Sequence, residues 1–223
     1  MSSPFEVVTF DCYGTLIDWE RGIREAFRRA AAEDGIEIDE ERLLETYAAV
    51  ERVVEQERYR RYRDVLWETG ARVAHAVGWP LERQRAGFLA DSLPFWRPFP
   101  DTNGALERLR DAGLTLGILS NVDDDLLWAT RRHLTVEFDL VVTAQQVSSY
   151  KPERAHFDAA RKQVGGRHWL HAAQSNYHDI VPANALGIPT AWINRHGGKA
   201  LPGGEPSMEY RELDGLAAAL AAS

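Results

Sequence analysis

The sequence predicts an α/β protein, with a doubly wound parallel-sheet core of the Rossmann type and an inserted all-helical cap domain. A short β-branched segment near the start ends in an aspartate, Asp11. From about residue 100 onward, short apolar segments alternate with helical patterns, which is typical of a parallel sheet with helices on both faces. Between Trp19 and Phe95 the pattern is helical, with no strand signal. We therefore expect a core domain of residues 1–17 and 97–223 and a cap domain of residues 18–96.

The composition is that of an ordinary globular protein. With 223 residues, 44% of them hydrophobic and 27% charged, the chain is able to bury a sizeable core. The formal net charge of −8 argues against nucleic acid or an anionic membrane as a partner, but a local cationic pocket still allows a small anionic substrate. The single cysteine, Cys12, cannot form an intrachain disulfide, and no apolar segment approaches the roughly 20 residues that span a bilayer. We expect a soluble cytoplasmic protein.

The first strand is predicted at residues 5–10, an apolar and β-branched segment between Pro4 and Gly14. Asp11 follows it directly. In an open parallel sheet, ligands bind beyond the carboxyl ends of the strands, so Asp11 lies where a catalytic carboxylate is expected. The alternative is structural, since aspartate is a favoured N-cap and Asp11 would then only cap a following helix.

The inserted segment is predicted to form a series of helices. In the first of them, Ile23, Phe27 and Ala30 recur at helical spacing before a stop at Gly35. A second helix is expected after Asp39, and further helices are expected around residues 65–77 and 81–93. The proline-punctuated residues 95–100 then return the chain to the core.

The rest of the core is predicted to follow a regular order of strands and helices. Strands are expected at residues 114–119, 140–143, 169–173 and 190–194. Helices are expected at residues 102–112, 124–134, 152–164, 179–186 and 213–222, with a glycine-rich loop at 197–205. This alternation implies a parallel sheet.

Polar side chains follow the predicted core strands. Ser120 and Asn121 end the second strand, and Lys151 follows the third through a loop. The residues after the fourth strand are also polar or aromatic: Gln174, Ser175, Asn176, Tyr177, His178 and Asp179. Each has an ordinary structural interpretation, since Ser-Asn is typical of a turn and a lysine at a helix start is typically solvated. Because the carboxyl ends of parallel strands meet at one edge of the sheet, we expect the whole set to converge on Asp11.

These motifs resemble those of the haloacid dehalogenase (HAD) superfamily. The segment Asp11-Cys12-Tyr13-Gly14-Thr15-Leu16 is similar to its first motif, whose aspartate attacks the substrate covalently. Ser120, Lys151 and Asp179 are similar to the later motifs in their order. Most members are phosphatases with a second aspartate two residues after the first, a position that Tyr13 takes here. An aromatic residue there, together with residues 148–152 and 192–195, resembles the (S)-2-haloacid dehalogenase (type II) branch.

The missing acids favour the dehalogenase branch over the phosphatases. Phosphoryl transfer normally uses Mg²⁺ held by carboxylate oxygens. Tyr13 and Gln174 stand at two of the acidic positions that the resemblance implies, which leaves Asp11 and Asp179. A halide needs neither a metal ion nor a proton to leave. We therefore expect no metal ligand and no cofactor, with Mg²⁺ needed only if the phosphatase alternative holds.

The resemblance implies a mechanism for a short 2-haloacid, which becomes a 2-hydroxy acid. Asp11 attacks the halogen-bearing carbon and forms an ester, which water then hydrolyses. Lys151 is expected to keep Asp11 ionised, while Asn176 and Asp179 orient the water. Catalytic roles are expected for Asp11, Thr15, Ser120, Lys151, Asn176 and Asp179. Contacts with substrate or halide are expected from Tyr13, Asn121, Gln174, Ser175, Tyr177 and His178.

Two other functions stay open: a HAD phosphatase acting on a small phosphate ester with Mg²⁺, and a non-catalytic or regulatory protein that binds a small molecule. Phe157 stands where the dehalogenase branch often has an aromatic hydroxyl, and Gln174 where it commonly has serine. The branch also uses a cap arginine to bind halide. None of the arginines at residues 52–63 is a clean match, and ion pairs with Glu51, Glu55 and Glu57 on a solvated helix are the simpler interpretation for most of them. The resemblance suggests a homodimer.

Overall fold

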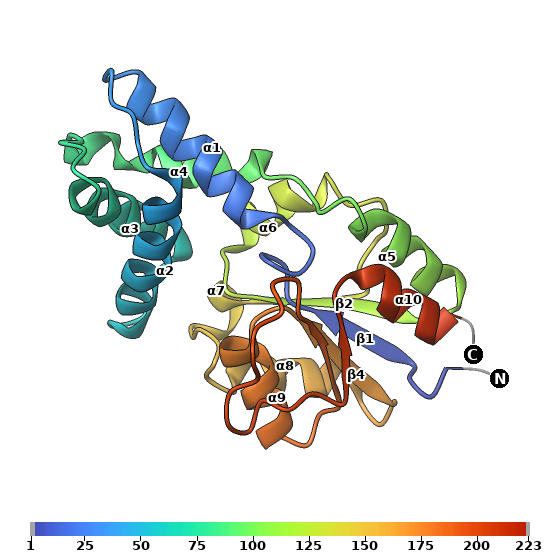
Figure 1. The fold of residues 1–223 in the computed structure, drawn as a ribbon. Helices are drawn as coiled ribbons and strands as arrows, with labels where there is room; N and C mark the ends of the chain where they lie inside the picture. Colours follow the sequence, from blue (N-terminus) through green and yellow to red (C-terminus); the bar gives the residue numbers. More distant parts are fainter. Residues whose placement is uncertain (1–2, 222–223) are drawn as a thin grey trace.

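The computed structural model describes residues 3–221 and shows a parallel sheet with helices packed around it (Figure 1). Within these residues, six strands form one sheet in which all neighbours are parallel. The strands are β1 (Val7–Phe10), β2 (Thr115–Ser120), β3 (Leu140–Thr143), β4 (Trp169–Ala173), β5 (Thr190–Ile193) and β6 (Met208–Tyr210). The predicted α/β fold class is confirmed.

The strand order places the end of β1 at the centre of the sheet. The order is β3-β2-β1-β4-β5-β6, so the chain moves outward from β1 to β3 and then continues on the other side of β1 with β4. In open α/β sheets, ligands bind at the carboxyl edge where the strand order reverses in this way. Asp11, which follows β1, lies at that point.

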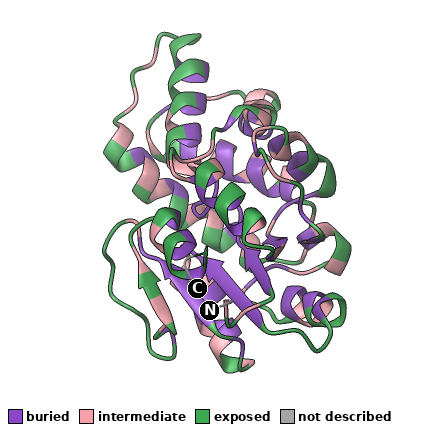
Figure 2. Cartoon of the chain, turned by 90° about the vertical axis from the view of Figure 1, so that its right-hand side faces the viewer, coloured by how far each residue is buried: buried purple, intermediate pink, exposed green. Residues whose placement is uncertain are grey.

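Helices cover both faces of the sheet. Those of the core are α5 (Thr102–Asp111), α6 (Asp124–Arg131), α7 (Ala144–Val147), α8 (Ala155–Val164), the π-helical turn η3 (Asn176–Ile180), α9 (Val181–Ala185) and α10 (Leu213–Ala221). In Figure 1, α5 and α10 lie above the sheet, and α8 and α9 lie below it. Side chains alternate along β1, so Val8 and Phe10 join the larger core cluster while Val7 packs in the cluster that contains Phe157 of α8. Figure 2 shows the central strands as buried and the outer faces of the helices as exposed.

Among the described residues, the segment between β1 and α5 forms helices without a strand. These are α1 (Trp19–Ala32), α2 (Glu40–Gln56), α3 (Tyr62–Ala76), η1 (Arg83–Gly87), α4 (Phe88–Ser92) and η2 (Leu93–Phe95). They lie together at the upper left of Figure 1. Phe27 of α1 packs edge-on against Phe88, with ring centroids 4.9 Å apart, and Trp79 packs against the same pair. We call these helices the cap; the division of the chain at residues 18–96 stays a prediction.

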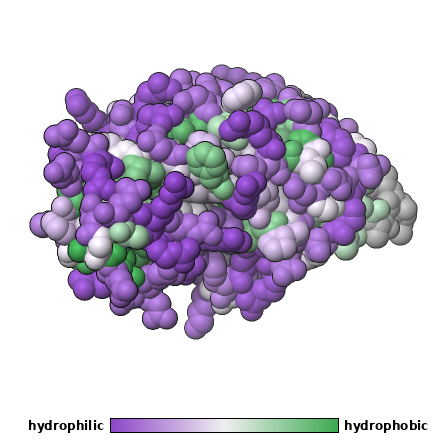
Figure 3. Space-filling view, turned by 90° about the horizontal axis from the view of Figure 1, so that it is seen from above, coloured by the Kyte–Doolittle hydropathy of each residue, from purple (hydrophilic) through white to green (hydrophobic). Residues whose placement is uncertain are grey.

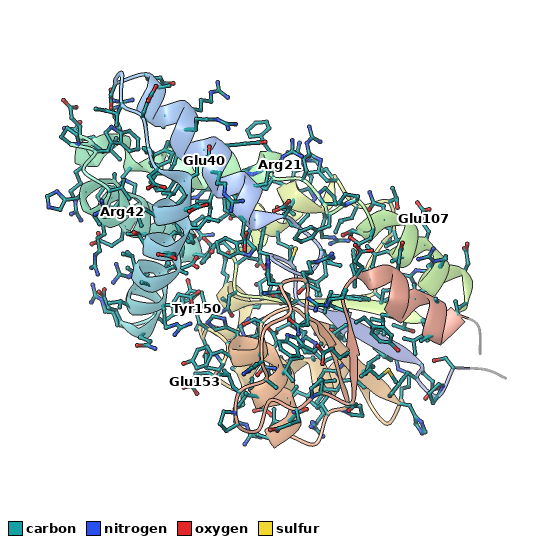
Figure 4. The ribbon with its side chains drawn as sticks, viewed as in Figure 1. Arg21, Glu40, Arg42, Glu107, Tyr150 and Glu153 are labelled. Atoms are coloured by element: carbon teal, nitrogen blue, oxygen red, sulfur yellow. The ribbon has the colours of Figure 1, made fainter. Side chains whose placement is uncertain are left out.

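Asp123 connects the cap to the core. Its carboxylate is fully buried and accepts the backbone N–H groups of Tyr62 and Arg63, each at 3.0 Å. Because α3 begins at Tyr62, Asp123 of the core provides the N-terminal capping group of this helix, and its negative charge interacts favourably with the positive end of the helix dipole. Nearby, the Tyr150 hydroxyl donates to the carbonyl of Arg60 at 2.9 Å, and Figure 4 shows Tyr150 close to the lower end of α2. These bonds hold the start of α3 over the strand ends.

The predicted secondary structure differs from the structure in several places: α7 was not predicted, and the helix predicted at residues 81–93 is divided into η1, α4 and η2. The helix predicted at residues 179–186 begins earlier, as η3, and continues as α9. Strand β6 was missed because three residues after a glycine- and proline-rich loop are too few to show alternation. Residue 222, where the last helix was predicted to end, lies outside the described residues.

The surface is mostly hydrophilic on the face that Figure 3 shows, with hydrophobic side chains in scattered groups. No helix within residues 3–221 is long and apolar enough to cross a membrane.

Candidate active site

Hydrogen bonds in the turn after β1 fix the position of the Asp11 carboxylate. The Thr15 hydroxyl donates to Asp11 Oδ2 at 2.9 Å and accepts the backbone N–H of Gln174, also at 2.9 Å. Gly14 has a φ of +96°, and a Cβ added there would lie 3.2 Å from Gln174 Oε1, so this turn favours glycine. The Arg195 guanidinium donates to the Thr15 carbonyl at 2.9 Å and fixes the far end of the turn. The carboxylate is therefore held in one orientation.

Lys151 joins the ends of three strands. Its ammonium donates to Asp11 Oδ1 at 2.9 Å, to the Leu119 carbonyl at 2.8 Å and to Asp179 Oδ1 at 2.6 Å. The side chain is only 1% exposed. Asn121 binds the backbone of Lys151 twice, since its amide accepts the Lys151 N–H at 2.7 Å and donates to the Lys151 carbonyl at 3.0 Å. The predicted convergence of Lys151 and Asp179 on Asp11 is thus present in the structure.

The three charged groups determine one another's pKa values. Burial raises the pKa of Asp11, and the opposing effects of Lys151 and Thr15 do not cancel this rise. Burial acts the same way on Asp179, but Lys151 and His171 outweigh it and lower its pKa to about 2. Burial disfavours the charged form of Lys151, yet the two carboxylates outweigh this effect and raise its pKa. At neutral pH, Asp179 and Lys151 form an ion pair beside the candidate nucleophile.

A cavity of about 210 Å³ opens above Asp11, between the strand ends and the cap. Most of the predicted site residues line it: Asp11, Tyr13, Ser120, Asn121, Lys151, Gln174, Ser175, His178 and Asp179. Thr15 lies behind Asp11 and is fully buried. Ser120 Oγ and Asp179 Oδ2 are buried and have no hydrogen-bond partner among the described residues. Both residues line the cavity.

Tyr13 and His178 contribute neutral surfaces to this cavity. The Tyr13 hydroxyl is paired with Thr130 Oγ1 at 2.8 Å, and burial raises its pKa well above the usual value. The Ser175 hydroxyl accepts the backbone N–H of His178 at 3.1 Å and contacts His178 Nδ1 at 3.0 Å. Burial lowers the pKa of His178 to about 4. Its imidazole is thus neutral at pH 7.

The expected positions of Asn176 and Tyr177 require correction. Asn176 does not line the cavity, because its amide donates to the Gly204 carbonyl at 2.8 Å and accepts the Leu201 N–H at 3.0 Å. Both ends of its amide contact the loop before β6, and its role in orienting water stays a prediction. Tyr177 lies outside the cavity as well, with its ring under the guanidinium of Arg52 at 5.3 Å.

The cap wall contains two carboxyl groups that the sequence did not predict as site residues. Glu51 accepts the hydroxyl groups of Tyr47 and Tyr62, both at 2.7 Å, and Glu55 lies 3.6 Å from His178 Nε2. Both line the cavity. Burial raises the pKa of Glu51, and burial together with the charge of Glu51 raises that of Glu55 well above the usual value. Among the described residues, Glu51 and Glu55 form no ion pair with an arginine, whereas Glu57 forms the expected ion pair with Arg60.

Two further residues lie at the site that the sequence did not assign to it, Arg52 and His171. Arg52 lines the cavity from α2, beside Glu51 and Glu55. His171 lies within β4 and binds Asp179 Oδ1 through Nε2 at 3.0 Å. The sequence feature that could have indicated His171 is a polar residue within an otherwise apolar, buried strand; in the sheet it lies opposite Thr9 of β1.

The donors at the site fit a metal ion poorly. Lys151 already lies between Asp11 and Asp179, the two carboxylates that would bind Mg²⁺. Tyr13 and Gln174 take the place of further acids. Among residues 3–221, no group of three or more His, Cys, Asp or Glu side chains is arranged to hold a metal ion.

The fold and site define an α/β protein with a buried carboxylate, that of Asp11, at the switch point of its sheet and helices above it. The sequence model of haloacid dehalogenase-like hydrolases matches residues 5–173, and the chain belongs to this family. The resemblance to the HAD superfamily is confirmed.

Similar proteins of known name include several dehalogenases. An (S)-2-haloacid dehalogenase of Pseudomonas putida is 30% identical over 125 residues, a match that covers 55% of each chain. Dehalogenase H-109 of the same species is 27% identical, with 94% of this chain and 95% of that protein covered. Haloacetate dehalogenase H-2 of Moraxella sp. (strain B) is 26% identical, with coverage of 86% and 87%.

Solved structures share the fold over nearly the whole chain. A defluorinating L-2-haloacid dehalogenase has a TM-score of 0.82 at 23% identity, covering 99% of this chain and 98% of that one. The L-2-haloacid dehalogenase of Xanthobacter autotrophicus has a TM-score of 0.80 at 21% identity, with 96% and 97% covered. A HAD-hydrolase of Bacillus subtilis bound to magnesium has a TM-score of 0.82 at 16% identity, with 97% and 98% covered.

Proposed function

We propose that the chain hydrolyses the carbon–halogen bond of a short 2-haloacid and releases a 2-hydroxy acid and halide. The reaction passes through a covalent ester on Asp11 and uses no metal ion. The observation that carries this proposal is the Lys151 ammonium, which bridges Asp11 and Asp179 at the base of the cavity. The names of the related dehalogenases support the same substrate class.

The first step is displacement at C2 of the substrate. A carboxylate oxygen of Asp11 forms a bond to C2 while the carbon–halogen bond breaks, and the halide leaves with the bonding electron pair. Thr15 and Lys151 hold the carboxylate so that little reorganisation is needed. Burial raises the nucleophile's pKa, so this step requires a pH above that raised value.

The second step is hydrolysis of the ester. Water attacks Cγ of Asp11, and Asp179 accepts the proton, because its Oδ2 has no other partner among the described residues. The bond between Cγ and the substrate oxygen then breaks, that oxygen takes the second proton of the attacking water, and the hydroxy acid leaves while Asp11 returns to its carboxylate form. The low pKa of Asp179 keeps it ionised at neutral pH.

The cavity supplies groups for an anionic substrate. Ser120 Oγ is buried and unpaired among the described residues, and it is a donor for the substrate carboxylate. Arg52 is the arginine of the described chain that lines the cavity, and we assign it the cap's interaction with carboxylate or halide. The raised pKa values of Glu51 and Glu55 favour their neutral forms, which lowers the repulsion of an anion. The rings of Tyr13 and Trp96 contact edge to face at 5.9 Å and limit access of water.

The test measures halide release from bromo-, chloro- and fluoroacetate, and phosphate release from p-nitrophenyl phosphate, with and without EDTA. We expect halide release that EDTA does not reduce and that Asp11→Asn abolishes, while the exposed control Asp111→Asn keeps wild-type activity. Phosphate release that EDTA stops would instead support a Mg²⁺-dependent phosphatase. Inactivity on every compound, with a melting shift on adding haloacid, would support a binding protein.

A single turnover in ¹⁸O-labelled water tests the ester route. Because water attacks Cγ of Asp11, the label enters the Asp11 carboxylate first, and mass spectrometry of the active-site peptide detects it. Label that appears directly in the hydroxy acid would contradict covalent catalysis by Asp11.

A further inference from the structure

A line of hydrogen bonds leads from the interior of the sheet to Asp179. The Trp169 indole N–H donates to Thr9 Oγ1 at 2.7 Å, Thr9 Oγ1 contacts His171 Nδ1 at 2.9 Å, and His171 Nε2 contacts Asp179 Oδ1 at 3.0 Å. Thr9 and His171 are fully buried and are register partners on β1 and β4. Phe157 packs its ring edge-to-face against the imidazole, with centroids 5.2 Å apart, and so fixes the plane of the ring.

These contacts determine the tautomer of His171. The indole is only a donor, so Thr9 Oγ1 accepts from Trp169 and has its own proton to give to Nδ1. The ionised Asp179 carboxylate can only accept, so His171 Nε2 carries a proton and donates it to Asp179 Oδ1.

The two donors on Asp179 Oδ1 leave its other oxygen free. Lys151 and His171 approach Oδ1 at 2.6 and 3.0 Å, while Oδ2 is buried and has no partner among the described residues. A carboxylate that is held by one oxygen from two directions cannot rotate without losing a hydrogen bond. Asp179, which lines the cavity, is therefore held with Oδ2 in a fixed orientation.

We propose that His171 is a positioning residue for the second half of the reaction. It orients Asp179 so that Oδ2 accepts the proton of the water that attacks the Asp11 ester, and Thr9 and Trp169 set its tautomer. This inference rests on the proposed function, because it assigns the residue to the hydrolysis of that ester. His171 does not contact Asp11, so formation of the ester does not depend on it in the same way.

The experiment separates the two half-reactions by rapid quench and intact-protein mass spectrometry, with 2-chloropropionate as substrate. For His171→Phe we expect ester formation within about threefold of the wild-type rate and ester hydrolysis slower by about 100-fold, as for a misplaced catalytic group. The ester then accumulates on Asp11. We expect less ester to accumulate in two other variants. His171→Gln keeps a side-chain N–H donor, and Thr9→Val removes the group that sets the tautomer.

His156→Phe is the matched control. It removes another fully buried imidazole, one that contacts the Ser120 carbonyl at 3.1 Å and forms no hydrogen bond to Asp179. It should not cause the ester to accumulate. Equal slowing of both half-reactions in all three test variants, or absence of accumulated ester in them, would overturn the role of His171. If His171→Phe does not fold, Thr9→Val and His171→Gln decide the question by the same measurement.

Failure of the proposed function is a separate result, since the wild type would then form no ester from any haloacid. The orientation of Asp179 is tested in that case by the ¹⁵N resonances of the His171 imidazole. A neutral ring protonated at Nε2, whose resonance moves in Asp179→Asn, supports the positioning contact. A ring protonated at Nδ1 overturns it.

Discussion

Replacement of Lys151 by methionine tests the electrostatic basis of the site without any assumption about the substrate. The ammonium makes three buried hydrogen bonds, two of them to carboxylates. Loss of one partner of a buried ion pair typically lowers the free energy of unfolding by about 3–5 kcal/mol, because the remaining charge is left uncompensated. Two carboxylates, Asp11 and Asp179, are left together in Lys151→Met, so we expect a loss in this range at pH 7.

The loss should depend on pH in a defined direction. Without Lys151, one of the two carboxylates has a pKa in the folded state that is raised above its unfolded value of about 3.9. Such a group favours folding fully below the unfolded pKa, and this contribution is lost as the pH rises through the folded pKa. One bound proton changes the free energy by about 1.4 kcal/mol per pH unit, so between pH 7 and pH 5 the variant recovers at most about 2.7 kcal/mol relative to the wild type.

The assay is urea denaturation of the wild type and of Lys151→Met at pH 5 and pH 7. Lys199→Met, which removes an exposed lysine, is the matched control and should stay within about 0.5 kcal/mol of the wild type. A difference between Lys151→Met and the wild type below about 1 kcal/mol, or one that is the same at both pH values, would refute the reasoning.

Three further results are expected. The raised pKa of Glu55 means that this group becomes charged only at higher pH, so KM for a haloacid should increase as the pH rises through the pKa of Glu55. Glu55→Gln should flatten this increase. A dependence of KM on pH that is the same in the wild type and in Glu55→Gln would contradict this role. Asp123→Ala removes the acceptor of two N–H groups at the start of α3 and should lower the free energy of unfolding by about 1–2 kcal/mol in denaturant titration. An unchanged free energy of unfolding would show that Asp123 does not stabilise the N-terminus of α3. Asn176→Ala should speed amide hydrogen exchange at Leu201, whose N–H loses its acceptor, and equal exchange in the two proteins would show that another contact holds the loop.

The sequence was sufficient to predict the site residues whose position follows from the topology of the sheet. Asp11, Ser120 and Lys151 follow buried strands of a parallel sheet, and the carboxyl ends of such strands meet at one edge whatever the details of packing. Their convergence could therefore be predicted without coordinates. The predicted α/β class rests on the same alternation of strands and helices.

The residues that could not be predicted depend on contacts between distant segments. Glu51 and Glu55 have the spacing of ion pairs on a solvated helix, and the sequence does not show that this face of α2 closes over the cavity. Asn176 was given a catalytic role from its place beside Asp179, but the loop before β6 competes for its amide. His171 looked like one more residue of a buried strand, because its partner Thr9 is 162 positions away in the chain.

The junction at Asp123 has a consequence for how this molecule tolerates change. Its carboxylate binds main-chain N–H groups of α3, and every amino acid except proline supplies such a group. Positions 62 and 63 are therefore free to vary in side chain without loss of these two bonds. Cap helices of altered specificity, grafted from relatives or taken from libraries, should dock on this core as long as Asp123 and the backbone path at the graft point are kept.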